Sequence, residues 1–113
     1  MESTATARYL RKTSRKARLV ADAIRGKKIG EALSLLEFSI TKDVAKDFHK
    51  LLKSAVANMQ SKNADVPIIV DDLKVKEVTV GAGPTLKRFR SCSQGRVAGI
   101  LKRMCHISIK VSN

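Results

Sequence analysis

The chain has 113 residues and a hydrophobic content of 43%, which fits one compact domain with a modest core and excludes a wholly disordered basic tail. Neither a run of about 18 apolar residues nor the hydrophobic segment of a secretory signal peptide is found, so we expect no transmembrane helix and no secretion. The 23 lysine and arginine residues outnumber the 10 aspartate and glutamate residues and give a net charge of +13, which predicts an intracellular protein that binds a polyanion.

The first basic block covers residues 1–28, in which nine basic and two acidic groups give a charge of +7. Residues 3–10 alternate small or apolar with polar side chains, which predicts a short strand. Ser14 as N-cap and Gly26 just past the end predict a helix over residues 15–25. One helical face is apolar (Ala17, Val20, Ala21 and Ile24), and the other carries Arg15, Arg18, Asp22 and Arg25. We expect the first face to pack and the second to present its guanidinium groups.

Residues 29–78 have a charge of −1 and predict two further helices. The first covers residues 30–38, and the second runs from the N-cap Thr41 to about Lys62, followed by a loop over residues 63–72. The long helix has an apolar stripe formed by Val44, Phe48, Leu51, Leu52, Ala55, Val56 and Met59. Its lysines lie elsewhere on the helix, and we interpret Lys42, Lys46, Lys50 and Lys53 as solvated.

The last part of the chain predicts strands. Residues 73–80 alternate with one slip of phase at Lys76–Glu77, for which a bulge is one explanation, and residues 107–111 alternate regularly. Residues 81–103 form either a long disordered loop or two strands of a protruding hairpin, and long structureless loops are uncommon in compact domains. We therefore predict an α+β fold, with three helices on a small antiparallel three-stranded sheet and a long protruding β-hairpin. Residues 1–113 form one domain in this prediction, with 81–103 as its basic arm.

The second basic block, residues 79–113, contains seven basic groups and no acidic group, a charge of +7. A basic ribbon with few large apolar residues is marginal alone in water, and phosphates would neutralise its repulsion. Phe89, between Arg88 and Arg90, is either a base-stacking residue or a packing anchor. Because aromatic residues make up only 4% of the chain and no RNA-recognition or zinc-finger motif occurs, recognition of RNA shape fits better than reading of base sequence.

The sequence predicts no enzyme, no cofactor and no metal site. His49 and His106 are isolated, and Cys92 and Cys105 lack the paired spacing of a zinc site. Two cysteines are also too few for a disulfide scaffold and are typical of a reducing compartment. No phosphate-binding loop, dinucleotide fingerprint or nucleophile elbow occurs.

Several motifs in order resemble one known family. The segment from Ser14 to Lys27 resembles the first helix of the bacterial-type large-subunit ribosomal protein family L twenty-two (universal "uL twenty-two"). The resemblance continues through residues 54–58, 83–88, 95–96 and 101–106. It covers nearly the whole chain with the spacing of the family, so the motifs together are specific where each alone is weak.

The resemblance implies a structural constituent of the large subunit that binds 23S ribosomal RNA and assists early assembly. It also implies a hairpin that runs along the nascent-peptide exit tunnel, facing ribosomal protein L four and the nascent peptide. Localisation in cytoplasmic ribosomes and the absence of a membrane partner or homo-oligomer follow. The expected RNA-binding residues are Arg8, Arg11, Lys12, Arg15, Lys16, Arg18, Arg25, Lys27, Lys28, Lys87, Arg88, Arg90, Arg96, Lys102, Arg103 and His106. The residues expected at the tunnel tip are Leu86, Lys87, Arg88, Phe89, Arg90, Ser91 and Cys92.

The sequence departs from the family at one place. Members commonly have Pro-Arg-Ala and a basic residue before the Gly-Arg pair, whereas this chain has Ser91, Cys92, Ser93 and Gln94. We therefore expect a less basic tip. The alternative to a ribosomal role is a free nucleoid-type or regulatory nucleic-acid binder that uses the same arm in a DNA groove, although no helix-turn-helix signature supports it.

Overall fold

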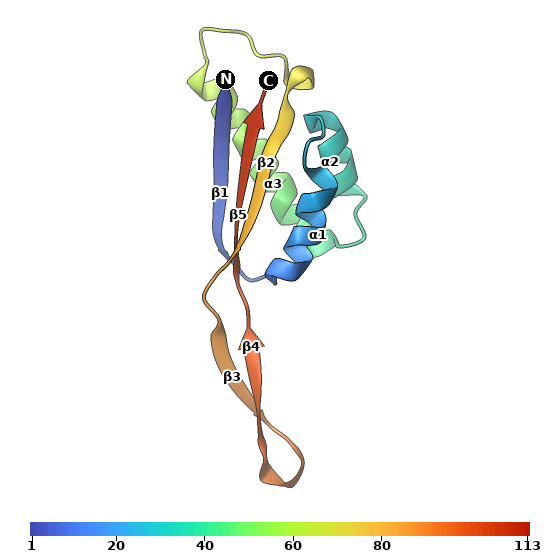
Figure 1. The fold of residues 1–113 in the computed structure, drawn as a ribbon, viewed down its shortest axis with the longest axis vertical. Helices are drawn as coiled ribbons and strands as arrows, with labels where there is room; N and C mark the ends of the chain where they lie inside the picture. Colours follow the sequence, from blue (N-terminus) through green and yellow to red (C-terminus); the bar gives the residue numbers. More distant parts are fainter.

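The structure is a computed structural model that describes residues 1–113, and it has a two-layer domain with a hairpin leaving one end of it (Figure 1). The elements are β1 (Glu2–Leu10), α1 (Ser14–Ile24), α2 (Ile29–Glu37), α3 (Lys42–Lys62), β2 (Lys74–Ala82), β3 (Leu86–Ser91), β4 (Val97–Lys102) and β5 (Cys105–Ser112). Two short 3-10 turns cover Val70–Asp72 and Ser93–Gly95. The expected α+β fold class is confirmed. None of the helices has the length and apolar character that crossing a membrane requires.

The domain is built on an antiparallel sheet with the strand order β1-β5-β2. The central strand β5 turns Cys105, Ile107, Ile109 and Val111 toward the helices, and all four are buried. The slip of phase at Lys76–Glu77 matches an irregularity of pairing, since the register of β2 against β5 shifts between Val75 and Glu77, and a bulge was one explanation for it. A second shift interrupts β1 between Ala7 and Leu10, where the sequence pattern predicted none.

The helices cover one face of the sheet and leave the other face open (Figure 1). Helix α1 buries Ala17, Val20, Ala21 and Ile24, the four residues predicted for its apolar face. Helix α3 buries its predicted stripe except for Val56, which is only half-buried, and it adds Ala45. Phe48 at the centre of this stripe is completely inaccessible to solvent. Helical periodicity therefore predicted the buried faces of α1 and α3 correctly at nearly every position.

The predicted helix boundaries need small corrections. Helix α1 begins at Ser14, and Thr13 takes the N-cap position without a side-chain hydrogen bond to the helix. Helix α2 begins at Ile29, whose side chain is buried and whose N–H, without a partner inside the helix, donates to the carbonyl of Leu73 over 3.1 Å. Gly26 ends α1 as predicted, with a φ of +79°, a conformation that glycine adopts without steric conflict.

The hairpin consists of β3 and β4, which form a separate two-stranded sheet. The disordered-loop alternative for residues 81–103 is therefore wrong, and the hairpin prediction is confirmed. None of the 23 buried residues lies between residues 83 and 104. The hairpin extends the molecule to 66 Å along its longest axis and gives a radius of gyration of 17.3 Å, against about 13 Å for a compact chain of this length.

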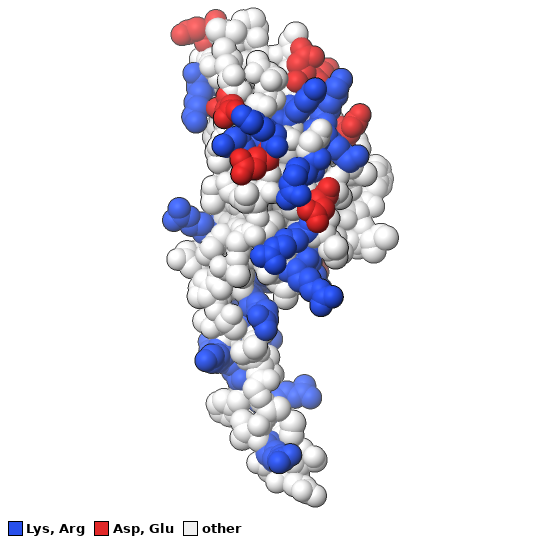
Figure 2. Space-filling model, viewed as in Figure 1, with Lys and Arg blue, Asp and Glu red and all other residues white.

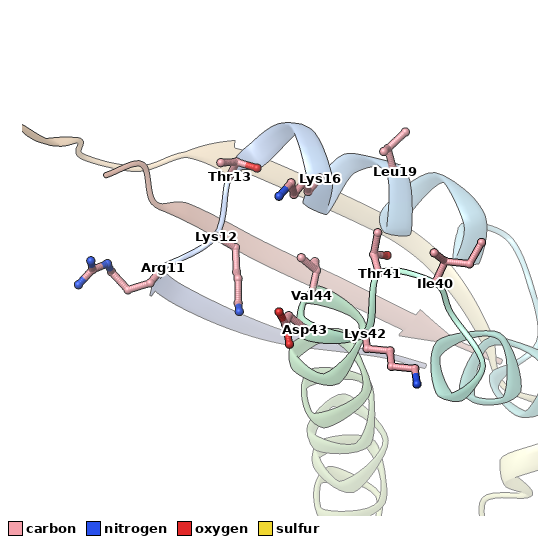
Figure 3. Close-up of a pocket in the computed structure, with 10 residues that line it drawn as sticks. All are labelled: Arg11, Lys12, Thr13, Lys16, Leu19, Ile40, Thr41, Lys42, Asp43 and Val44. Carbon is pink, nitrogen blue, oxygen red and sulfur yellow. The ribbon is translucent and has the colours of Figure 1, made fainter. Parts of the chain in front are cut away.

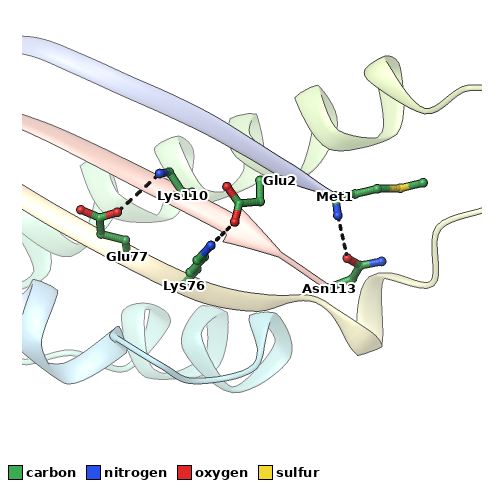
Figure 4. A network of polar contacts seen from close by, with 6 residues as sticks. All are labelled: Met1, Glu2, Lys76, Glu77, Lys110 and Asn113. Atoms are coloured by element: carbon green, nitrogen blue, oxygen red, sulfur yellow. Dashed lines mark hydrogen bonds and ion pairs between the residues drawn. The ribbon is translucent and has the colours of Figure 1, made fainter.

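A network of polar contacts ties the three strands together at the end of the sheet that lies opposite the hairpin (Figure 4). Lys76 on β2 pairs with Glu2 on β1, and Lys110 Nζ on β5 lies 3.5 Å from Glu77 Oε2. The hydrogen bond from Lys76 is the main cause that lowers the pKa of the Glu2 carboxyl below its ordinary value. Because these side chains are largely exposed, we expect them to fix strand register more than to add stability.

Candidate RNA interface

The hairpin has two faces of different character, which follow from the register of its strands. Cross-strand partners share a face, and Arg88 pairs with Ile100 while Arg90 pairs with Ala98. Lys102, opposite Leu86, lies on the same face. Three cations therefore project from this face, which we call the cationic face.

The opposite face of the ribbon, which we call the apolar face, carries exposed apolar side chains. Phe89 pairs with Gly99, Lys87 with Leu101, and Ser91 with Val97. Phe89, Val97 and Leu101 are 77%, 69% and 51% exposed. Phe89 is thus no packing anchor within the chain. Exposed apolar residues in such a row are typical of a surface that contacts another molecule.

The turn of the hairpin lies at residues 92–96. The Cys92 N–H donates to the carbonyl of Arg96 over 2.6 Å, and Gln94 and Gly95 both have positive φ values, of 60° and 73°. Of the residues predicted for the tip, only Ser91 and Cys92 adjoin this turn. Leu86 lies at the other end of the ribbon, and the residues between them lie along β3.

Basic groups dominate the hairpin without any compensating acid. Residues 83–104 contain six basic and no acidic side chains, and all six are exposed. In Figure 2 the acidic residues gather on the domain, and the visible face of the hairpin carries only basic and uncharged residues. With no acid to pair with, these cations repel one another until a polyanion lies alongside.

Helix α1 carries a second basic surface, part of which is tied to the sheet. The Arg25 guanidinium donates to Asp22 Oδ1 over 2.7 Å and to the carbonyl of Val78 over 2.9 Å. Arg18 donates to the carbonyl of Val80 over 3.5 Å. These two arginines therefore help to hold α1 on β2 while remaining exposed. The other predicted residues of this surface, Arg15, Lys16, Lys27 and Lys28, are also exposed.

A groove of about 650 Å³ separates the end of β1 from the start of α3 (Figure 3). Its basic rim connects three elements, because Arg11 and Lys12 follow β1, Lys16 comes from α1 and Lys42 comes from α3. Asp43 is its single acidic residue. The exposed side chains of Leu19 and Ile40 give the groove an apolar part.

The four lysines of α3 that were expected to be solvated lie together along one groove. A second groove of about 650 Å³ is lined by Lys42, Lys46, His49, Lys50 and Lys53 together with Leu36 and Glu37. The spacing of four, four and three residues between the lysines could have revealed this common surface. The lysine cluster gives α3 a basic face, so the two-layer domain carries basic surfaces on both α1 and α3.

The remaining predicted residues lie close to the point where the hairpin leaves the sheet. Arg8 is exposed in β1, and Arg103 is exposed in the link between β4 and β5. His106 is half-buried, and its Nδ1 accepts a hydrogen bond from the Tyr9 N–H over 3.0 Å. Cys92 is exposed and Cys105 is buried, so the two thiols belong to different environments.

Residues 5–112 match the sequence model of the family Ribosomal protein L22p/L17e. Because the match covers nearly the whole chain, the protein belongs to this family, and it is a structural constituent of the large ribosomal subunit. The family consists of structural ribosomal proteins and is not an enzyme family. The resemblance found in the sequence motifs is thereby confirmed.

Proposed function

From its membership of the L22p/L17e family and the form of its hairpin, we propose that this protein binds 23S ribosomal RNA and assists assembly of the large subunit. The hairpin carries the proposal, because its six exposed cations have neither acidic partners nor a core to pack on. Arginine suits this task, since its planar guanidinium makes bidentate contacts with phosphate and stacks on bases. The basic surfaces of α1 and the β1 end supply further phosphate contacts.

The two faces of the hairpin support a more specific role as part of the wall of the nascent-peptide exit tunnel. A two-stranded ribbon is narrow enough to lie within an RNA wall, because its strands are only about 4.8 Å apart. The cationic face would contact RNA phosphates. The apolar face with Phe89, Val97 and Leu101 would meet the nascent peptide or the neighbouring ribosomal protein L four.

The RNA-binding proposal is tested by the salt dependence of binding to a 23S ribosomal RNA transcript. Each lost phosphate contact lowers the slope of log affinity against log salt by roughly 0.7–0.9. We expect the triple variant Arg88→Gln, Arg96→Gln, Arg103→Gln to lower the slope by about 2–3. When the salt is raised from about 50 to about 200 mM, both proteins lose affinity, and the factor lost by the variant should be roughly 20 to 40 times smaller than the factor lost by the wild type.

A charge-matched control uses Lys46→Gln, Lys50→Gln and Lys53→Gln on α3. A smaller change of slope than in the hairpin variant would show that location matters as well as charge. Equal losses in both triple variants, or an unchanged slope in the hairpin variant, would refute the hairpin as the main RNA interface.

Sedimentation separates the ribosomal role from the alternative of a free nucleic-acid binder. We expect the protein in cell extracts to sediment with the 50S particle and to stay with it at high salt. A pool that sediments entirely with the nucleoid would favour the alternative.

A further inference from the structure

The irregularity in β1 places a tyrosine in an unusual backbone conformation. Ala7 pairs with Ile107 and Leu10 with Cys105, so Arg8 and Tyr9 together oppose the single residue His106. Tyr9 takes up the extra length with a φ of +57°. This left-handed conformation is uncommon for a bulky residue, and bulges of this kind re-aim a side chain. The bulge therefore sets the direction of the Tyr9 ring.

His106 holds the ring of Tyr9 in place. Its Nδ1 accepts the N–H of Tyr9 over 3.0 Å, and the two ring centroids lie 4.9 Å apart at an angle of 89°. Behind the imidazole, a Cβ on Gly83 would come within 3.3 Å of the ring. The imidazole thus contacts Tyr9 and lies close to Gly83, and it acts as a positioning residue.

The tyrosine ring stays available to a ligand. Tyr9 is 62% exposed, and in a T-shaped pair at least one face of its ring is left uncovered by the imidazole. Burial of the ring in the core therefore does not account for the strained backbone that presents it.

Arginines lie near Tyr9 and near its partner His106 in the sequence. Arg8 precedes Tyr9, Arg11 follows it by two residues, and Arg103 lies three residues before His106. In Figure 1 the end of β1 lies where the hairpin leaves the sheet. An exposed aromatic ring on a basic surface is the combination that binds unpaired bases, because every base has a face that stacks and the cations can contact the backbone phosphates.

We propose that Tyr9 is a stacking platform for one unpaired RNA base at the root of the hairpin, held in position by the hydrogen bond and ring contact with His106. This inference rests on the proposed RNA-binding function and adds a base contact to it. In this arrangement His106, which was expected to contact RNA, acts through Tyr9.

The test compares Tyr9→Gly with Tyr9→Phe in binding to the 23S ribosomal RNA transcript. Glycine removes the ring but adopts the left-handed conformation freely, so the fold should melt no lower than the wild type. We expect Tyr9→Gly to bind about 5- to 150-fold more weakly, the loss that corresponds to one stacked base. Its salt slope should stay unchanged because no phosphate contact is lost. Tyr9→Phe keeps the ring and should bind within about twofold of the wild type.

The other outcomes overturn the inference in distinguishable ways. Wild-type affinity of Tyr9→Gly, together with a lowered salt slope of the hairpin arginine variant, would refute the platform and leave the RNA-binding proposal intact. A clearly lower melting temperature of Tyr9→Gly would show that the ring serves the fold. Failure of the wild-type protein to bind the transcript would refute both proposals.

Discussion

Replacing the 20 residues from Pro84 to Arg103 by Asn-Gly is expected to leave the two-layer domain folded and to remove most of its RNA binding. The backbone permits this excision, because the Gly83 N–H already donates to the carbonyl of Met104 over 2.9 Å. Two strands joined by such a hydrogen bond can be closed by a two-residue turn, for which Asn-Gly is favoured.

The magnitude follows from burial and chain length. No residue of the excised segment belongs to the buried core, so no large loss of hydrophobic stabilisation is expected. Shortening a connection from 20 residues to two lowers the entropy cost of closing it by up to about 2 kcal/mol. Removing six basic groups also lowers the net charge from +13 to +7 (13 − 6). The free energy of unfolding should therefore rise by about 0–2 kcal/mol.

Urea unfolding followed by far-UV circular dichroism measures this change, and filter binding to the 23S ribosomal RNA transcript measures the functional loss. If all six cations contact phosphates, the salt slope should fall by about 4–5. A loss of more than about 2 kcal/mol of stability would show that the hairpin supports the domain. A slope equal to that of the intact protein would show that the hairpin makes no phosphate contacts.

Two further predictions concern the core. Phe48→Ala should lower the free energy of unfolding by about 3–5 kcal/mol in urea titrations, because the side chain is fully buried. The control Phe38→Ala, at an 82% exposed position, should change it by less than about 0.5 kcal/mol. Similar effects in both variants would contradict the packing described. Burial, with a smaller effect of Asp47, raises the pKa of the Cys105 thiol, so the folded state keeps this proton at a pH where the unfolded chain has released it. Stability should therefore fall as pH rises above about 8.5, and part of that fall should be missing in Cys105→Ala. In a separate measurement, an alkylating reagent should modify Cys92 in the native protein and Cys105 only on unfolding.

Much of the fold could be read from local patterns. The spacing of Ala17, Val20, Ala21 and Ile24 identified the buried face of α1, because helical geometry alone places these residues together. The slip of alternation at Lys76–Glu77 located the irregularity of β2, because side chains in a strand alternate with a period of two; a bulge was one explanation for that slip. Gly26 marked the end of α1 because the required φ of +79° favours glycine.

The basic character of the candidate interface could be predicted from the sequence, but the arrangement of its side chains on the two faces of the hairpin could not. The acid-free block that ends the chain indicated a basic arm, but the sequence did not show that Arg88 and Arg90 share one face while Phe89 and Val97 share the other with Leu101. That division depends on the pairing of β3 with β4. The common face of the α3 lysines follows from their spacing, and only the packing against α2 adds Leu36 and Glu37 and completes the groove.

By itself, the sequence determined which side of each element is apolar, where the charge lies along the chain, and to which family the motifs point. The tertiary structure alone decided which distant residues meet. The N–H of Ile29, at the start of α2, donates to the carbonyl of Leu73, and the N–H of Tyr9 donates to the ring of His106, 97 residues away. Periodicity is a local property of a few turns or residues, whereas these contacts arise only when β5 is paired between β1 and β2.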